Sequence, residues 1–164
     1  MATDTPVGVP TYTAGPMLRP VDKQDVRFLR DMLRHAYHWR MAQDPDLPVY
    51  RYVQNWGRRG DAGVVAFDGL NVHGAAWYRL FSVDEPGFGF VDERTPELTI
   101  AVVPSARGHG TGAELLEALI ARARADGYSQ VSLSAEDGQT GFYEKHGFRP
   151  VGRHDGTVTM LATL

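Results

Sequence analysis

Two stretches of the chain place apolar residues at helical spacing. The first follows Asp22, whose side chain can cap a helix, and it predicts a helix that runs to about Arg40. The second follows a glycine-rich loop and predicts a helix that ends at Gly127. The apolar positions are Val26, Leu29, Leu33, Ala36 and Tyr37 in the first helix and Leu115, Leu116, Leu119, Ile120 and Ala123 in the second.

Alternation of polar and apolar residues predicts strands around these helices. In Glu97–Val103, Leu98, Ile100 and Val102 form an apolar face, and the opposite face carries the Glu97 carboxylate. Further strands are expected at residues 17–19, 63–67, 73–81, 130–135, 151 and 158–161, with a short helix at 141–146, while residues 87–91 are ambiguous. The order strand, glycine loop, helix, strand in the second half favours a parallel, right-handed crossover within a mixed α/β domain.

Length and composition indicate one folded unit behind a tail. The 164 residues suit a single domain, and the 43% hydrophobic and 23% charged fractions are near average for soluble proteins. Residues 1–16 are rich in proline and glycine, so we expect a flexible tail there and a single domain over residues 17–164. Residues 41–60 read as a proline-interrupted, aromatic connection with a short helix at about 50–56.

Charge and cysteine content exclude several functions. The formal net charge of -3 and the lack of a basic stripe disfavour a nucleic-acid partner. No stretch approaches the ~20 apolar residues of a membrane span and no secretory signal is present, so we expect a cytoplasmic protein without a membrane partner. The absence of cysteine excludes thiolate zinc sites and a cysteine acyl-enzyme. The histidines show no metal-ligand spacing beyond the weak pair His35 and His38, so no metal is predicted.

A glycine-rich loop at residues 107–112 carries the first chemical signal. It follows a strand and opens a helix, so its backbone N–H groups and the positive end of the helix converge on one spot that favours phosphate. Three glycines allow close approach, and Arg107 adds a cation. Neither the P-loop nor the G-x-G-x-x-G dinucleotide pattern fits, because Gly112 is followed by Ala113 and Glu114.

Two motifs together carry a family resemblance. Residues 102–112 resemble the acyl-CoA-binding signature of the GCN5-related N-acetyltransferase (GNAT) superfamily, Arg/Gln-x-x-Gly-x-Gly/Ala, with Arg107, Gly110 and Gly112 in its defining places. One strand further along, residues 141–148, which read Gly-Phe-Tyr-Glu-Lys-His-Gly-Phe, look like the second hallmark of that family. Both motifs occur in the family's order and on the predicted elements.

The resemblance implies a fold and an activity. The fold is a mixed, mostly antiparallel sheet flanked by helices, whose central parallel strands, here Glu97–Val103 and Gln130–Ala135, are splayed to hold acyl-CoA. The activity is transfer of an acetyl group from acetyl-CoA to a primary amine by direct attack in a ternary complex. The chain departs from the family at Glu136 and Asp137, where asparagine is common, and this bears on a contact to the pantetheine arm. Homodimers are common in the family.

Candidate catalytic and cofactor residues follow from these motifs. A lysine-like amine with a pKa of ~10.4 must lose a proton before it attacks, and Glu97 is the candidate base, with a solvated strand-end carboxylate as the alternative. Tyr143 holds the family's general-acid position, where it would protonate or hold the leaving thiolate; its alternative is a packing role. Weaker candidate bases are Asp92, Glu93, Glu136 and His73. The cofactor-binding residues implied are Val102, Val103, Arg107, Gly108, His109, Gly110, Thr111 and Gly112.

The acceptor site is expected where aromatic residues gather, in the 41–60 connection and beside it. The predicted acceptor-binding residues are Trp39, Tyr50, Tyr52 and Trp77, alongside Arg40, and Asp44 and Asp46 could attract a cationic amine. Any one of these aromatics is equally expected in the core. We expect a small-molecule or peptide acceptor. A protein N-terminal or lysine acetyltransferase and a non-catalytic acyl-CoA sensor remain as alternatives, and an acyl group longer than acetyl is also open.

Overall fold

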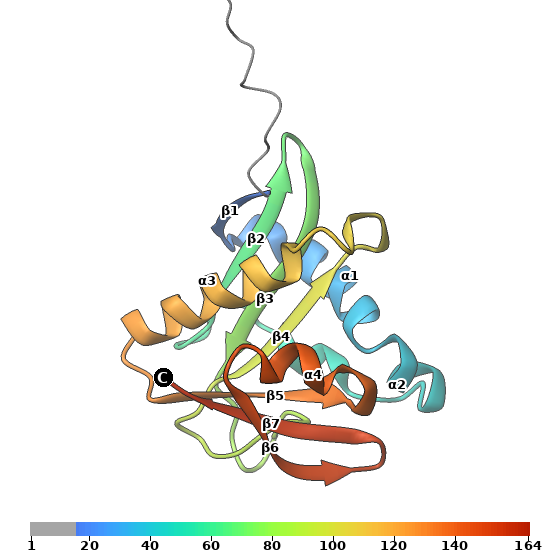
Figure 1. Ribbon diagram of the computed structural model, residues 1–164, viewed down its shortest axis with the longest axis vertical. Helices are drawn as coiled ribbons and strands as arrows, with labels where there is room; N and C mark the ends of the chain where they lie inside the picture. Colours follow the sequence, from blue (N-terminus) through green and yellow to red (C-terminus); the bar gives the residue numbers. More distant parts are fainter. Residues whose placement is uncertain (1–15) are drawn as a thin grey trace, which may run out of the picture.

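The computed structural model describes residues 16–164, which form a seven-stranded sheet with helices on both faces (Figure 1). The strand order is β1-β2-β3-β4-β5-β7-β6, and every pair of neighbours is antiparallel except β4 and β5. The strands are β1 (Met17–Pro20), β2 (Ala62–Asp68), β3 (Asn71–Arg79), β4 (Glu97–Val102), β5 (Gln130–Glu136), β6 (Phe148–His154) and β7 (Thr157–Thr163). This confirms the predicted fold class. Of the predicted tail, residues 1–15 lie outside the described residues.

Helices cover the two faces of the sheet. Helix α3 (Thr111–Ala125) crosses in front of the strands and α1 (Val26–Ala36) crosses behind them (Figure 1). The shorter helices are α2 (His38–Gln43) and α4 (Thr140–Glu144), and single 3-10 turns occupy Lys23–Asp25, Val49–Tyr52, Pro104–Ala106 and Asp137–Gln139.

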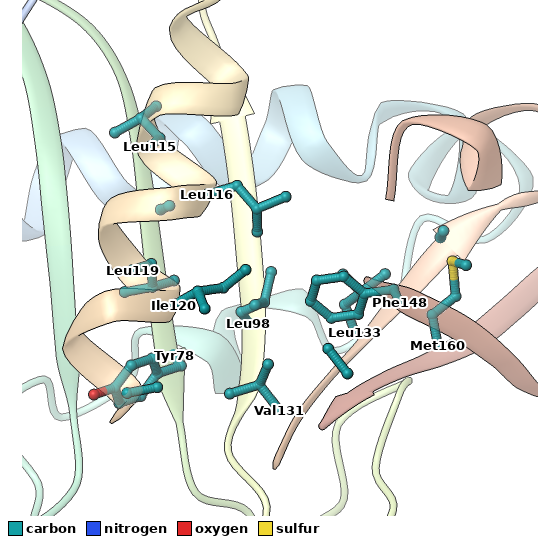
Figure 2. Close-up of a cluster of buried hydrophobic side chains, with 14 of the residues drawn as sticks. Tyr78, Leu98, Leu115, Leu116, Leu119, Ile120, Val131, Leu133, Phe148 and Met160 are labelled. Carbon is teal, nitrogen blue, oxygen red and sulfur yellow. The ribbon is translucent and has the colours of Figure 1, made fainter. Parts of the chain in front are cut away.

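The core has two halves because strand residues alternate between the faces. Figure 2 shows the half under α3, where leucines of the helix lie over Leu98 of β4 and the cluster continues to Leu133 of β5 beside Phe148. The half under α1 includes Ala101 of β4 and Trp77 of β3. The alternation that predicted β4 from the sequence is therefore the alternation that divides the core.

The parallel crossover β4–α3–β5 forms as predicted, but its strands pair over a very short length. Glu97 and Ser132 are partners, and the Ser132 N–H donates to the Pro96 carbonyl at 3.0 Å. Beyond this point β4 and β5 separate, since the cavity described below lies between them. The splayed parallel pair that the resemblance implied is present.

Several predicted boundaries were wrong, and tertiary packing explains the most important one. The helix expected to run from Asp22 to Arg40 ends at Ala36, because Tyr37 adopts φ -117° and ψ 19° and packs its ring against Tyr52 and Phe88. The expected helix at residues 50–56 is only the turn Val49–Tyr52, and β3 ends at Arg79 rather than at residue 81. The strand expected at residue 151 is part of the longer β6. The ambiguous residues 87–91 form no strand.

Candidate functional site

A cavity of about 700 Å³ opens where β4 and β5 separate. Its walls come from residues 98–102 of β4, residues 133–136 of β5, the α1–α2 junction at residues 35–40, and Tyr143 of α4. Arg107 and Gly112, at the start of α3, border the same cavity. The separation of two adjacent strands therefore brings both sequence hallmarks to one space.

The loop before β4 closes the cleft on the side where the strands still pair. Gly89 lies so close to β5 that a Cβ there would be 2.6 Å from the Leu133 carbonyl oxygen and 2.7 Å from the Ser134 nitrogen. The Ser132 hydroxyl donates to the Gly89 carbonyl at 2.8 Å. A residue without a side chain is needed for this contact, which fixes the loop to β5 at the apex of the opening.

The backbone of β4 divides its hydrogen-bonding groups between β3 and the cavity. The Val103 N–H donates to the His73 carbonyl of the β3 side at 2.7 Å. Hydrogen-bonding direction alternates along an antiparallel strand, so the N–H groups of Ile100 and Val102 point to the opposite edge, where β5 has diverged. Of the two backbone positions predicted for the cofactor, Val102 therefore faces the cavity, whereas the Val103 N–H belongs to the β3–β4 ladder.

The glycine-rich loop enters α3 without a side-chain cap. Gly110 occupies the N-cap position with φ 80°, a conformation that favours glycine, and no side chain accepts from the first amides of the helix. The Arg107 side chain donates to the Val102 carbonyl at 3.0 Å and borders the cavity. Of the other predicted loop residues, Gly108 and His109 are exposed and Thr111 is buried. The loop therefore presents backbone donors and one cation beside the cleft.

Tyr143, the predicted general acid, lines the cavity from α4. It is half-buried and packs edge-on against Phe142 and Phe148, with ring centroids 5.1 and 5.9 Å away. Burial raises the pKa of Tyr143 to about 12, against a lowering effect of the Arg40 charge. The phenol is therefore neutral at physiological pH and can donate a hydrogen bond into the cleft.

Glu97 is buried rather than solvated, with 1% of its surface exposed. Its carboxylate accepts a hydrogen bond from the Tyr52 hydroxyl, which in turn accepts from the Phe88 N–H at 2.7 Å. Burial raises the pKa of Glu97 to about 7, although the bond from Tyr52 acts to lower it. A carboxyl group with this pKa exchanges its proton near neutral pH, as a general base requires. Glu97 does not itself line the cavity.

Two tyrosines and a threonine lie between Glu97 and the cavity. Tyr37 borders the cavity, and its ring centroid is 5.3 Å from that of Tyr52. Burial, followed by the charge of Glu97, raises the pKa of Tyr37 above its usual range, and the side chains of Tyr52 and Thr99 act against this rise. Thr99 also lines the cavity. The rings of Tyr52 and Tyr37 thus lie side by side between the buried carboxylate and the open space.

The four predicted acceptor-binding aromatics are not brought together. Trp39 borders the cavity, with 46% of its surface exposed. Tyr50 lies outside the cavity beside the exposed face of α1. Tyr52 and Trp77 are fully buried, and the Trp77 indole donates to the Tyr52 carbonyl at 3.0 Å. Tyr52 and Trp77 therefore lie in the core, where Tyr52 binds Glu97, and do not line the cavity.

The other polar candidates separate in the same way. Glu136 borders the cavity, while Asp44 and Asp46 are exposed and outside it, as are Asp92 and Glu93. His73 also lies outside the cavity. Within residues 16–164, no three His, Cys, Asp or Glu side chains gather as a metal site, and no helix is long and apolar enough to cross a bilayer.

Two cavity residues, Thr99 and Ser134, escaped the sequence analysis, and Arg40 was named there only beside the predicted aromatic residues. Arg40 is 8% exposed and lines the cavity, and its position three residues after Tyr37 and seven after Leu33 is on the apolar face of the predicted helix. A charged residue at such a position was the available signal. Thr99 and Ser134 fall on strand positions that share the face of Glu97 and Ser132, which alternation predicts once the strands are aligned.

Solved structures resemble this fold along nearly the whole chain. The paiA N-acetyltransferase from Thermoplasma acidophilum, in complex with coenzyme A, is 14% identical over 92% of this chain and 100% of the other, with a TM-score of 0.67. The ribosomal-protein-alanine N-acetyltransferase from Brucella melitensis is 22% identical (90% and 99% covered, TM-score 0.61). YncA from Salmonella typhimurium, with its cofactor acetyl-CoA, is 20% identical (92% and 95%, TM-score 0.62). The fold is that of N-acetyltransferases.

A comparison of the sequence with protein-family models identifies the family. The model of the acetyltransferase (GNAT) domain matches residues 59–150, more than half of the chain. The protein therefore belongs to the GNAT family of acyl-CoA-dependent acetyltransferases, as the two motifs predicted. No curated protein matches the sequence significantly.

Proposed function

We propose that this chain transfers an acetyl group from acetyl-CoA to a primary amine of a small molecule or peptide. The observation that carries the proposal is the cleft between β4 and β5, which opens directly beside the uncapped start of α3. The two features suit the two ends of acetyl-CoA. The pantetheine arm needs backbone partners along a strand, and the pyrophosphate needs N–H donors at a helix N-terminus.

The residues present fit that ligand. The N–H groups of Ile100 and Val102 point into the opening, where an extended arm with amide groups would add to β4 like a strand. Gly110, Gly112 and Arg107 would hold the pyrophosphate at the entry to α3. An N–H of β4 near the thioester would stabilise the oxyanion that forms when the carbonyl is attacked.

The acceptor amine attacks the thioester carbon, and its extra proton passes to Glu97. Because Glu97 is buried behind Tyr52, the proton reaches it through the Tyr52 hydroxyl, which donates to the carboxylate, and Tyr37, which borders the cavity, is the next hydroxyl toward the amine. Both tyrosines stay neutral, since their pKa values are raised, and each relays a proton by accepting one and donating another. A carboxyl group whose pKa is about 7 is half ionised at neutral pH and can receive it.

The carbon–sulfur bond then breaks, and the thiolate of coenzyme A leaves beside the Tyr143 hydroxyl. Its hydroxyl has a pKa of about 12, well above the ~8.5 of an ordinary thiol, so a stable transfer of the proton to sulfur is unfavourable. We therefore assign Tyr143 a hydrogen bond to the departing sulfur, which stabilises the developing charge. This role keeps Tyr143 at the sulfur, while Glu97 takes the proton of the amine.

A small acceptor fits the shape of the site. Trp39 and the α1–α2 junction cover one side of the cleft, and the built Cβ of Gly156, in the β6–β7 turn, would lie 3.5 Å from the Trp39 ring. Trp39 and the β6–β7 turn therefore narrow this side of the cleft, where a protein chain would need an open groove. The site therefore favours small molecules or short peptides over folded protein acceptors.

The proposed function is tested by calorimetry with acetyl-CoA and by thiol release in the presence of an amine panel. Arg107→Glu should weaken acetyl-CoA binding about tenfold or more, because it replaces a cation beside the phosphates with an anion. Arg30→Glu makes the same charge change on the exposed face of α1 and serves as the control. Equal affinities of the two variants would show that the loop does not hold the phosphates. If none of the amines in the panel causes thiol release, amine acetylation is refuted.

A further inference from the structure

Arg40 is a buried cation without a counter-ion. It lies on α2, lines the cavity and is 8% exposed. Its Nε has no hydrogen-bond partner, and no carboxylate of the described residues lies within ion-pair distance of the guanidinium. The guanidinium carbon instead lies 5.0 Å from the centroid of the Tyr37 ring and 5.7 Å from that of Phe88. These rings hold Arg40 in place.

A charge in this position is costly to the protein alone. Removing a guanidinium from water is unfavourable unless it gains ionic or hydrogen-bonded partners, and two aromatic faces replace only part of that hydration. Neither Glu97, one oxygen of which accepts from Tyr52, nor Glu136 lies within ion-pair distance of Arg40. The open direction for Arg40 is the cavity, which indicates that its partner is a ligand.

Two further polar groups share the cavity with Arg40. The hydroxyls of Thr99 on β4 and Ser134 on β5 are buried, line the cavity and have no partner at hydrogen-bond distance. Both lie on the same side of the sheet as Glu97 and α1, opposite the apolar side chains Leu98 and Leu133. The α1 side of the cleft thus offers a cation and two hydroxyl donors, which is a donor set suited to a carboxylate.

The position of Arg40 separates this anion from the phosphates of acetyl-CoA. Those phosphates have their own donors at Arg107 and the start of α3. Arg40 instead packs on Tyr37, whose ring lies beside Tyr52, the hydrogen-bond partner of Glu97, and it shares the cavity with Tyr143. The anion that it meets is therefore next to the amine that is acetylated.

We propose that the acceptor is a small molecule with a carboxylate close to its amine, as in a free amino acid, and that Arg40 binds this carboxylate. The inference rests on the proposed function and names its acceptor class. In the reaction the amine nitrogen forms a bond to the acetyl carbon, the carbon–sulfur bond breaks, coenzyme A leaves as the thiolate, and the amine proton passes to Glu97. The product is an N-acetylated amino acid, and the carboxylate is unchanged.

The test compares each acceptor with its neutral counterpart. Thiol release is measured with the common amino acids, with their primary amides and with amines that lack a carboxyl group, all with acetyl-CoA. For an accepted amino acid we expect kcat/KM at least tenfold above that of its amide, because the amide cannot form a charge-assisted pair with the guanidinium. The difference should lie mainly in KM.

Two variants of Arg40 assign the discrimination to this residue. Arg40→Met keeps an unbranched stem without the charged guanidinium and should reduce kcat/KM for the amino acid about 10- to 100-fold while changing that for the amide little. Arg40→Lys keeps the charge but loses the planar fork, and it should restore part of the preference. Arg34→Met, on the exposed face of α1, is the matched control.

The possible outcomes separate the two proposals. A preference for amino acids that disappears in Arg40→Met supports the inference. If amides or carboxyl-free amines react as well as amino acids, or if Arg40→Met slows acid and amide equally, the carboxylate site is refuted and amine acetylation stands. If no amine releases thiol although acetyl-CoA binds, the proposed function fails and the acceptor class fails with it.

Discussion

Glu97 has the most unusual environment of any single carboxylate in the site. Its 1% exposure and its bond from the Tyr52 hydroxyl leave it with a pKa of about 7. Desolvation disfavours the charged form and is the dominant cause, while the Tyr52 bond favours the charged form and limits the rise. A pKa near 7 suits a general base that works near neutral pH, and this is why Glu97 is our candidate for that role.

If Glu97 is the base, activity should follow its ionisation. The base accepts a proton only when it is deprotonated, so kcat should rise with pH and level off above about 7. In Glu97→Gln this rise of kcat with pH, the acidic limb of the profile, should vanish, and kcat at pH 8 should fall by ~10²–10⁴-fold. The measurement is a pH–rate profile at saturating acetyl-CoA and acceptor.

The acceptor amine also loses a proton as the pH rises, so the experiment must distinguish its ionisation from that of Glu97. Two accepted amines with different amine pKa values should give the same limb near pH 7, because the limb belongs to the enzyme. A limb that moves with the amine, or a Glu97→Gln variant that keeps the wild-type profile, would assign the ionisation elsewhere. Tyr52→Phe removes the hydroxyl bonded to Glu97 and should shift the limb to higher pH, since that bond lowers the carboxyl pKa.

Tyr143 gives a second prediction for a single residue. Tyr143→Phe keeps the edge-on packing against Phe142 and Phe148 but removes the hydroxyl that we place at the sulfur. We expect kcat to fall by ~10²-fold or more and the affinity for acetyl-CoA to change little. Single-turnover rates and calorimetry measure the two effects. An unchanged rate would show that Tyr143 only packs, and Phe142→Tyr, also beside the cavity, controls for changes to this wall.

Among the elements, the strands and the crossover were predictable and the path of the first helix was not. β4 alternates cleanly and ends at a proline, and the loop before α3 carries a family motif, so local sequence was enough for both. The break at Tyr37 has no glycine or proline to announce it. It results from the burial of the Tyr37 ring against Tyr52 and Phe88, which lie far along the chain, and it redirects Arg40 into the cleft.

The connection at residues 41–60 shows the same dependence on distant partners. Its aromatic composition predicted a wall of the acceptor site, but Tyr52 points into the core. The cause is the buried pair of Arg79 and Asp61, at 2.7 Å, in which Arg79 also donates to the Arg51 and Gln54 carbonyls. These bonds tie the connection to β3. Sequence spacing does not reveal a partner 25 or more residues away.

For the whole molecule, the sheet consists of two antiparallel halves joined at one weak point. β1 to β4 form one half, β5 to β7 form the other, and between them Glu97 and Ser132 are the paired residues. Helix α3 packs on β2, β3 and β4 of the first half, and the apolar cluster beneath it continues from Leu98 to Leu133 of β5 (Figure 2). Beyond the junction, the facing edges of β4 and β5 lack the strand partner that a continuous sheet would supply.

Acetyl-CoA should therefore act as the missing strand and stabilise the whole fold. At a ligand concentration 100 times Kd, linkage predicts about 2.7 kcal/mol of added stability, which for a chain of this size raises Tm by about 5–10 °C. Hydrogen exchange should show new protection of the Ile100 and Val102 amides, since these point into the cleft. Adenosine 3′,5′-bisphosphate, which lacks the pantetheine arm, should protect the start of α3 and leave Ile100 and Val102 unchanged. Equal protection of β4 by both ligands would mean that the arm does not lie between the strands, because only the arm can reach them.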